Sequence, residues 1–255
     1  MLVSHLHKFI FLRPRKVAST TIEVYFERFC LPAKLLIDYT PTHKRSLCIT
    51  PAGIVTSRAA ETPKEAKEVI TEPLVRRTKH NQAYGKWSKN LSRHLLATKV
   101  KTRVGDLNWN DYFKFSAVRN PYTKAVSWYY FIKSLKNYKG TPLTTDLDTE
   151  RNNFSNWVMS EDCTKFFDYE KQILTIDNEY CYDDVIRFED LQNEIVRISN
   201  KLNLPVDNNY IKHYKSNKAP FTADLLYTDT AKQKILDVAG DYINRFGYVF
   251  PIASK

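Results

Sequence analysis

Short apolar runs alternate with amphipathic segments along this chain, and their order predicts strands separated by helices. Residues 9–12 and 185–188 are short runs typical of strands, the first of them apolar and β-type, and residues 113–118 alternate between apolar and polar positions as a strand does. Apolar residues at helical spacing follow each run, first over residues 20–30. Because parallel strands need crossover connections, this pattern predicts an α/β fold with a central, mostly parallel sheet flanked by helices.

Two of the predicted helices carry clear boundary signals. Asn120 offers a capping side chain, and Pro121 follows it at the first helical position. The last helix is predicted to begin near Asp229 and to end at Gly247, because glycine commonly adopts the left-handed conformation that stops a helix.

Residues 31–110 and 135–180 lack a regular pattern. Prolines interrupt the first of these segments, where short helices are predicted over residues 63–70 and 92–104. The chain has no internal repeat and no low-complexity tract. Residues 1–255 are therefore predicted to form one domain, in which the irregular segments are insertions and loops.

Composition narrows the function. The chain has 255 residues, and 39 Lys and Arg against 28 Asp and Glu give a formal charge of +11, which favours an anionic partner. The 6 glycines form neither a G-x-G-x-x-G nor a G-x-x-x-x-G-K-[ST] motif, and the 4 cysteines form no C-x-x-C pair. No apolar run is long enough to span a membrane and no secretory signal is recognisable, so a cytoplasmic protein with reduced thiols and no membrane partner is predicted.

The loop after the first strand has the chemistry of a phosphate site. It runs from Arg13 to Thr21 and leads into a helix, whose N-terminus offers unpaired N–H groups and a positive dipole end to an anion. Lys16 adds a positive charge. Thr20 and Glu23 have the spacing of a capping box, so a capped helix after a solvated basic turn is an equal interpretation of this loop alone.

A second loop, after the strand at residues 113–118, carries Arg119. Arginine can bind a phosphate through two parallel hydrogen bonds, and Ser127 lies about two turns into the following helix. Taken singly, the loop is also explained by an ion pair of Arg119 with a surface carboxylate and by a packed Ser127. In parallel sheets, however, ligands bind where strands lead into helices, which is where both loops lie.

Together the two loops resemble the PAPS-dependent sulfotransferases. The run Lys-Val-Ala-Ser-Thr-Thr at residues 16–21 is similar to the family's 5′-phosphosulfate loop. The run Val-Arg-Asn-Pro-Tyr at residues 118–122, with Ala-Val-Ser at residues 125–127, is similar to its 3′-phosphate motif. Residues 186–191 and 246–250 resemble later elements of the family. The resemblance points to the carbohydrate-type branch in a soluble microbial form, and it implies a P-loop-like, three-layer sandwich.

The resemblance implies transfer of a sulfuryl group from PAPS to an acceptor hydroxyl, with PAP as the product and no metal. Lys16 would also offset the charge that develops on the leaving oxygen, while Arg119 and Ser127 would hold the 3′-phosphate. Arg187 is placed near the nucleotide, with a salt bridge to Glu189 or Asp190 as the alternative. The implied donor-site residues are Arg15, Lys16, Val17, Ala18, Ser19, Thr20, Thr21, Arg119, Ser127, Arg187 and Lys218.

The acceptor hydroxyl needs a general base, and histidine titrates near neutral pH. In relatives a histidine before a small helix, ahead of the Arg-Asn-Pro strand, has this role, and His94 matches that position. A helix-capping or core histidine is the alternative interpretation of His94. His80 is the next candidate, and Glu72 or Glu68 would serve if the base is a carboxylate. Two other histidines near the N-terminus, His5 and His7, are expected to be solvated.

The acceptor is predicted to be a glycan, and the basic segment over residues 73–103 would suit an anionic one. A P-loop kinase is the second hypothesis, against which the missing G-K-[ST] and the lack of a clear Mg²⁺ carboxylate count. A non-enzymatic polyanion-binding protein is the third. A nucleic-acid partner is not predicted, because the sequence has no helix-turn-helix, zinc finger or RNA-binding aromatic motif.

Overall fold

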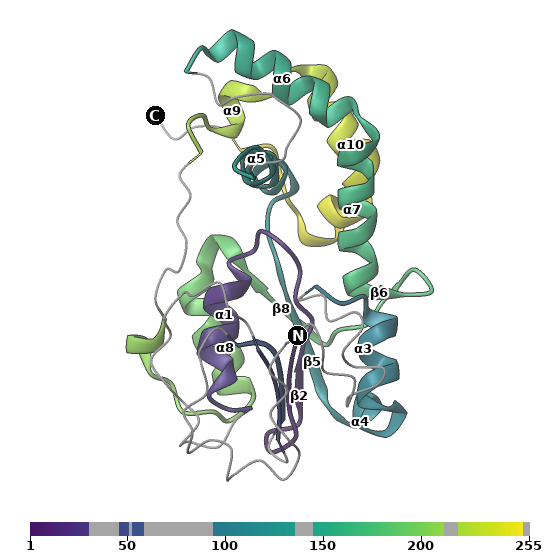
Figure 1. Ribbon diagram of the computed structural model, residues 1–255, viewed down its shortest axis with the longest axis vertical. Helices are drawn as coiled ribbons and strands as arrows, with labels where there is room; N and C mark the ends of the chain where they lie inside the picture. Colours follow the sequence, from purple (N-terminus) through teal and green to yellow (C-terminus); the bar gives the residue numbers. More distant parts are fainter. Residues whose placement is uncertain (31–45, 51–52, 59–93, 136–144, 212–218, 252–255) are drawn as a thin grey trace. The chain divides into compact units, whose positions relative to one another are not determined.

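A computed structural model describes residues 1–30, 46–50, 53–58, 94–135, 145–211 and 219–251. The chain divides into two compact units (Figure 1). The sheet unit contains residues 1–117 and 172–214, and the helical unit contains residues 118–171 and 215–255. Each unit has its own hydrophobic core.

The sheet unit is built on one mixed sheet, with the strand order β3-β4-β1-β2-β5-β8 among the described residues. The strands are β1 (Leu2–Ser4), β2 (Phe9–Phe11), β3 (Ser46–Thr50), β4 (Gly53–Arg58), β5 (Phe113–Val118) and β8 (Asp184–Arg187). β2 and β5 are parallel, whereas β1 is antiparallel to both β2 and β4, and β3 is antiparallel to β4. The turn between β1 and β2 is too short for a crossover, so this pair has to be antiparallel.

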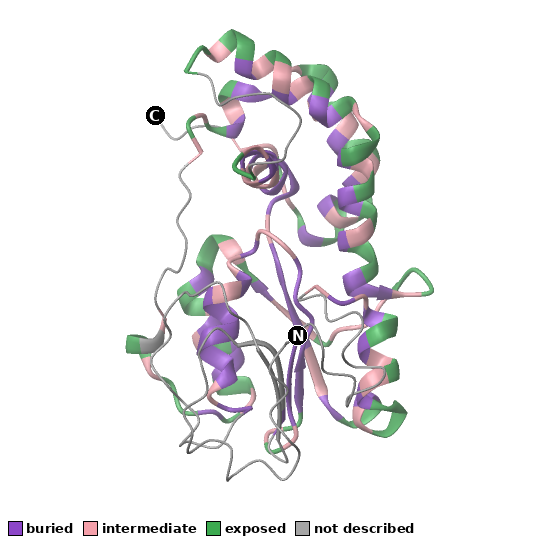
Figure 2. Ribbon diagram, viewed as in Figure 1, coloured by how far each residue is buried: buried purple, intermediate pink, exposed green. Residues whose placement is uncertain are grey.

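Helices cover both faces of the sheet, which makes the sheet unit three-layered (Figure 1). Because side chains alternate along a strand, Leu2, Phe9 and Phe11 pack on one face, and Val3, Ile10 and Leu12 pack on the other. The first face is covered by α1 (Ser19–Glu27) and α8 (Leu191–Lys201), and the second by α3 (Ala97–Val104) and α4 (Asp106–Asp111). Figure 2 shows that α1 is buried along almost its whole length.

The predicted α/β class, with a central sheet flanked by helices, is confirmed. The strand predicted over residues 113–118 is β5, the strand predicted over residues 9–12 is β2, which ends one residue earlier, and the strand predicted over residues 185–188 is β8, displaced by one residue. The antiparallel strands β1, β3 and β4 were not predicted. The helix predicted over residues 92–104 begins at Ala97 in the structure, and the one predicted over residues 63–70 lies outside the described residues.

The sheet unit also contains a two-stranded ribbon and two 3₁₀ turns. They are the two-stranded ribbon of β6 (Thr175–Ile176) and β7 (Glu179–Tyr180), and the 3₁₀ turns η4 (Phe188–Asp190) and η5 (Asn208–Tyr210). The ribbon lies beside α3, and η4 joins β8 to α8. The strand β8 therefore passes directly into a helix, as the predicted strand-helix alternation requires.

The helical unit packs its helices around aromatic side chains. They are α5 (Pro121–Lys133), α6 (Leu147–Met159), α7 (Glu161–Leu174), α9 (Ala223–Leu226) and α10 (Asp229–Phe246). In the core, Tyr129 meets Phe154 edge to face, with ring centroids 5.2 Å apart, and Trp128 stacks on Phe166 at 4.7 Å. The aromatic run of α5 thus belongs to the core of this unit.

Two buried ion pairs fix α5 to its neighbours. The ammonium group of Lys124 lies 2.7 Å from the Glu170 carboxylate on α7, and that of Lys133 lies 2.8 Å from Glu150 on α6. All four side chains are at most 4% exposed. Such pairs are costly to break from one side, because the partner is left as an unpaired buried charge.

The boundary signals of α5 and α10 are confirmed. The side chain of Asn120 accepts a hydrogen bond from the Tyr122 amide, and Gly247 adopts the left-handed conformation with a φ of 65°. In contrast, α6 and α7 occupy much of the segment that was predicted to consist of loops, and α6 has its own cap, in which the Asp146 side chain accepts from the Thr149 amide. Among the described residues, no helix has the length and apolar character needed to cross a membrane.

Candidate active site

The loop between β2 and α1 has an unusual backbone for a sequence without glycine. Lys16 has a φ of 59° and Ala18 a φ of 54°, and both angles lie in the left-handed region that side chains other than glycine rarely adopt. Ala18 is the N-cap of α1 and contributes no side-chain cap hydrogen bond. Left-handed residues just before a helix turn successive N–H groups toward one point, which forms a concave site for an anion. No acidic residue occupies the first turn of α1.

Contacts to the core and to β5 hold this anion-binding loop (residues 12–18) in place. The side chain of Val17 is fully buried in the core beneath α1. The Leu12 amide donates to the Phe115 carbonyl at 2.9 Å, and the Ser116 hydroxyl donates to the Leu12 carbonyl at 2.8 Å. Strained backbone of this kind persists where the surroundings fix it, and it clusters at ligand sites.

The predicted donor-site residues of this loop differ in exposure. Arg15, Lys16, Ala18 and Thr20 are half-buried, whereas Val17, Ser19 and Thr21 are buried. The predicted capping box is wrong, because Glu23 pairs with a residue at the start of the loop and α1 has no side-chain cap. A basic, hydroxyl-bearing loop with left-handed backbone at Lys16 and Ala18 therefore remains at this edge of the sheet.

The partner of Glu23 is Arg13, and both side chains are buried. The guanidinium NH2 nitrogen of Arg13 lies 3.0 Å from the Glu23 carboxylate, at 2% and 5% exposure. On its other side Arg13 meets His94, which precedes α3. The Nδ1 atom of His94 lies 2.9 Å from the Arg13 carbonyl oxygen, and the Nε2 atom lies 3.4 Å from the Arg13 NH1 nitrogen. The pair of Arg13 and Glu23 was not predicted from the sequence, where Glu23 was assigned to a capping box, because nothing local marks a pair that forms across the loop.

The surroundings of His94 disfavour the predicted role of general base. Burial lowers the pKa of His94 from 6.5 to about 2, and the charge of Arg13 acts in the same direction. An efficient base has a pKa near the working pH and a lone pair that faces the substrate. In His94 the lone pair of Nε2 instead accepts from Arg13. The alternative interpretation of a core histidine fits these contacts.

The second predicted loop lies in the helical unit, at the start of α5. The Nε–H of Arg119 donates to the Thr123 hydroxyl at 3.1 Å, and the Arg119 amide donates to the Tyr242 hydroxyl at 3.1 Å. The Thr123 hydroxyl in turn donates to the Asn120 carbonyl at 3.1 Å. Thr123 and Ser127 are four residues apart in α5 and so share one face of the helix, while Arg119 precedes the N-cap and reaches Thr123 through its side chain.

The C-terminal segment supports this second loop. The side-chain Nδ2 of Asn120 donates to the Val249 carbonyl at 2.7 Å, and the ring of Tyr242 stacks on that of Tyr248 with an interplanar angle of 12°. The run at residues 246–250, which resembles the end of the family's sequence, therefore holds Asn120, the N-cap of α5, through the Val249 carbonyl. Thr123 and Tyr242 were not predicted, although the four-residue spacing from Arg119 to Thr123 was visible in the sequence.

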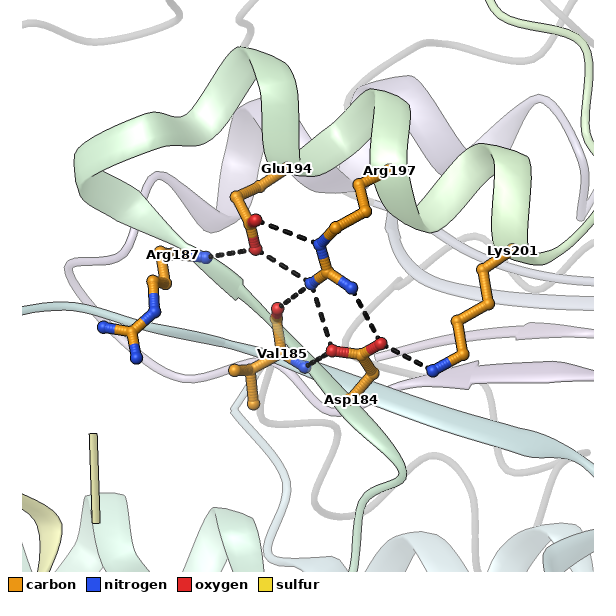
Figure 3. Close-up of polar contacts among 6 residues, drawn as sticks. All are labelled: Asp184, Val185, Arg187, Glu194, Arg197 and Lys201. Atoms are coloured by element: carbon orange, nitrogen blue, oxygen red, sulfur yellow. Dashed lines mark hydrogen bonds and ion pairs between the residues drawn. The ribbon is translucent and has the colours of Figure 1, made fainter. Parts of the chain in front are cut away.

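Arg187 lies at the carboxyl end of β8. The Asp183 amide donates to the Lys114 carbonyl at 2.7 Å, so β8 begins beside the start of β5 and runs in its direction. Because β5 is parallel to β2, Arg187 and the anion-binding loop leave the sheet at the same edge. Arg187 is exposed, and Figure 3 shows its guanidinium pointing away from the neighbouring ion-pair network.

That network holds the backbone around Arg187. The Glu194 carboxylate accepts from the Arg187 amide at 3.1 Å and from Arg197, and Arg197 also binds Asp184 (Figure 3). Burial alone would raise the pKa of Asp184, but hydrogen bonds from Arg197 and Lys201 outweigh it and lower this pKa to about 2. The turn from β8 into α8 is thus held by ion pairs between charged side chains of the strand and of the helix.

Several predicted candidates lie outside the described residues. These are Lys218 of the donor site and the alternative bases His80, Glu72 and Glu68. The expectation that His5 and His7 are solvated is wrong, since both are half-buried. The Nδ1 atom of His5 lies 2.8 Å from the Tyr112 hydroxyl, and His7 packs edge to face on Phe29.

A pocket in the helical unit is lined by hydrogen-bonding side chains. Its volume is about 300 Å³, and its walls are formed by Tyr129, Lys133, Asn153, Asn156, Trp157, Ser160 and Asp162. Amides, a hydroxyl and a carboxylate together offer both donors and acceptors to a polar ligand. Among the described residues, no group of three or more His, Cys, Asp or Glu side chains is arranged to hold a metal ion.

Comparison with known proteins relates these features to a family. The family model described as "Sulfotransferase family" matches residues 1–248, a range that includes the anion-binding loop and the Arg119 loop. The chain belongs to the sulfotransferase family. No match was found for this sulfotransferase among curated proteins or among solved structures. Its membership supports a transferase that moves a sulfuryl group from a sulfate donor to an acceptor.

Proposed function

We propose that this sulfotransferase takes its sulfuryl group from PAPS and delivers it to a hydroxyl of a carbohydrate. The observation that carries the proposal is the anion-binding loop, in which Lys16 and Ala18 adopt left-handed backbone immediately before α1. A basic loop of this geometry, in a chain of this family, suits the 5′-phosphate of the donor. The amides and hydroxyls of residues 19–21 would complete this subsite.

The Arg119 loop would provide the 3′-phosphate subsite. Its Nε–H donates to the Thr123 hydroxyl, and Thr123 lies on the same face of α5 as Ser127. A guanidinium at the start of a helix and a hydroxyl on that helix suit a terminal phosphate monoester. This second phosphate distinguishes PAPS from ATP-like nucleotides, so the loop would determine donor choice. Arg187, Arg15 and Lys218 are assigned to nucleotide binding on the resemblance alone.

The chemistry is a transfer between two oxygens. The bond from sulfur to the bridging phosphate oxygen breaks, a new bond from sulfur to the acceptor oxygen forms, and the hydroxyl proton is released. PAP leaves with the electron pair of the broken bond. By analogy with phosphoryl transfer, the protein has to align the two oxygens and stabilise the charge on the leaving one. Lys16 would provide that charge stabilisation.

The proposal leaves His94 out as the general base. Its Nε2 lone pair accepts from Arg13, and its pKa is lowered to about 2. A carbohydrate acceptor is supported by the chemistry of the pocket in the helical unit, where Asn153, Asn156 and Ser160 carry groups that bind sugar hydroxyls.

A reducing, cytoplasmic location is also part of the proposal. Cys30, Cys163 and Cys181 are free thiols, as the sequence predicts for such a compartment. Burial raises the pKa of Cys163 to about 12 and that of Cys181 to about 11, so both thiols stay protonated at neutral pH. Thiols of this kind are structural and chemically inert.

The proposal is tested by incubating the protein with ³⁵S-labelled PAPS and a panel of glycans in EDTA. Labelled glycan should form, and Lys16→Ala should reduce its rate of formation about 100-fold, as expected for loss of one charge-stabilising group. Lys8→Ala is the matched control. Lys8 also has a positive φ but lies in the turn between β1 and β2, at the opposite end of β2. Transfer from ATP with Mg²⁺ instead of PAPS would refute the proposal and favour a kinase.

A further inference from the structure

A cluster of three residues, with Arg13 and Glu23 buried and His94 half-buried, joins the two faces of the sheet behind the anion-binding loop. Glu23 belongs to α1, which covers one face, and His94 precedes α3, which covers the other. Arg13 lies between them, bound to Glu23 at 3.0 Å and to His94 through two contacts. Arg13 is also the second residue after β2, where the loop begins.

The contacts define the protonation of the histidine. A guanidinium only donates hydrogen bonds, so the Nε2 atom of His94 has to be the acceptor of its contact with Arg13. The Nδ1–H then donates to the Arg13 carbonyl at 2.9 Å. Both nitrogens of one neutral ring are thus engaged by the same residue, one through its backbone and one through its side chain.

We propose that His94 is a positioning residue, which clamps Arg13 and thereby holds the anion-binding loop in its ligand-ready shape. Lys16 follows Arg13 by three residues, and its left-handed backbone is sensitive to how the start of the loop is held. The base role would need the same Nε2 lone pair to face an acceptor hydroxyl, so the two roles exclude each other. The inference rests on the proposed function for its ligand, PAP, but not for the clamp itself.

Two substitutions separate the roles. In His94→Asn the amide N–H takes the approximate place of Nδ1–H and can still donate to the Arg13 carbonyl, whereas His94→Ala removes both contacts. Asparagine cannot accept a proton from a hydroxyl, so both variants would be equally inactive if His94 were the base. His5→Ala is the matched control, since it also removes a histidine contact in the sheet unit, but in the turn between β1 and β2, at the opposite end of β2.

The experiment measures two quantities on the full chain at pH 7. Calorimetry gives the affinity for PAP, and hydrogen exchange gives the protection of the amides of residues 17–21. We expect His94→Ala to weaken PAP binding about tenfold, the effect of one ordinary hydrogen bond. Amide exchange in the loop should become faster in this variant. His94→Asn should restore most of both properties, and His5→Ala should resemble the wild type.

The outcomes distinguish the clamp from the function it serves. Unchanged PAP affinity and unchanged loop protection in His94→Ala would overturn the inference and leave the proposed function intact. A wild-type protein that does not bind PAP would overturn the proposed function, and the exchange data alone would then decide on the clamp. Equal losses in the alanine and asparagine variants would also contradict the inference, because rescue by the retained N–H is what the geometry requires.

Discussion

The burial of a neutral histidine makes a quantitative prediction about stability and pH. His94 has an ordinary pKa of 6.5 in the unfolded chain and a pKa of about 2 in the folded one. Below pH 6.5 the unfolded chain therefore binds a proton that the folded chain does not bind. The stability due to His94 is complete above this pH and is lost progressively as the pH falls. The loss is about 1.4 kcal/mol per pH unit, or about 2 kcal/mol between pH 8 and pH 5.

The perturbation is His94→Asn, which places a group that does not titrate at the same position. The free energy of unfolding of wild type and variant is measured by urea titration at pH 8, 7, 6 and 5. All other titrating groups contribute to both proteins, so the difference between the two isolates His94. The stability of the wild type relative to the variant should fall by about 2 kcal/mol from pH 8 to pH 5.

Positive groups around the His94 ring strengthen the effect of burial, and His5 provides a control position for the experiment. Arg13, Arg15 and the amino group of Met1 are the positive groups that lower the pKa further. His5→Asn should show a smaller pH-dependent difference, because burial alone lowers the pKa of His5, whose ring lies beside a neutral Tyr112, whereas positive charges add to burial at His94. A constant difference between wild type and His94→Asn over this pH range would mean that His94 titrates normally. That result would refute the burial argument and restore the ring as a candidate base.

Three further predictions concern single side chains. Lys16→Ala should lower the turnover number with PAPS about 100-fold while the control Lys8→Ala leaves it unchanged, as initial rates would show. Arg119→Ala should weaken PAP binding about 10- to 100-fold in calorimetry but leave AMP binding nearly unchanged; equal losses would remove the 3′-phosphate assignment. Lys133→Met should destabilise the protein by about 3–5 kcal/mol in urea unfolding, because it leaves Glu150 buried and unpaired, and adding Glu150→Leu should recover most of that loss.

Local signals in the sequence predicted the elements that carry the site. The alternation in residues 113–118, the cap at Asn120 and the stop at Gly247 each depend on neighbours in the chain, and each is confirmed. The strands β1, β3 and β4 were missed because they are short and their partners come from other parts of the chain. The helix α6 was missed because the first part of its segment is polar, although its cap at Asp146 was visible in the sequence.

The interpretation of single residues was limited by contacts over long sequence separations. Thr20 and Glu23 have the spacing of a capping box, but Glu23 binds the buried Arg13 instead. His94 looked like a base from its position before a helix, whereas its partner lies 81 residues away. No periodicity or motif reports such a partner. The sequence therefore located the loops correctly, while the role of a residue beside them depended on the tertiary structure.

The central claim is that this sulfotransferase has a donor site for a nucleotide with two separate phosphate groups. Calorimetric titration of the wild-type protein with PAP, in EDTA and with AMP as the 3′-dephosphorylated control, tests it most directly. The account predicts micromolar binding of PAP and much weaker binding of AMP, because only PAP carries the 3′-phosphate for which the Arg119 loop is proposed. Equal affinity for the two nucleotides, or no binding of PAP, would contradict it.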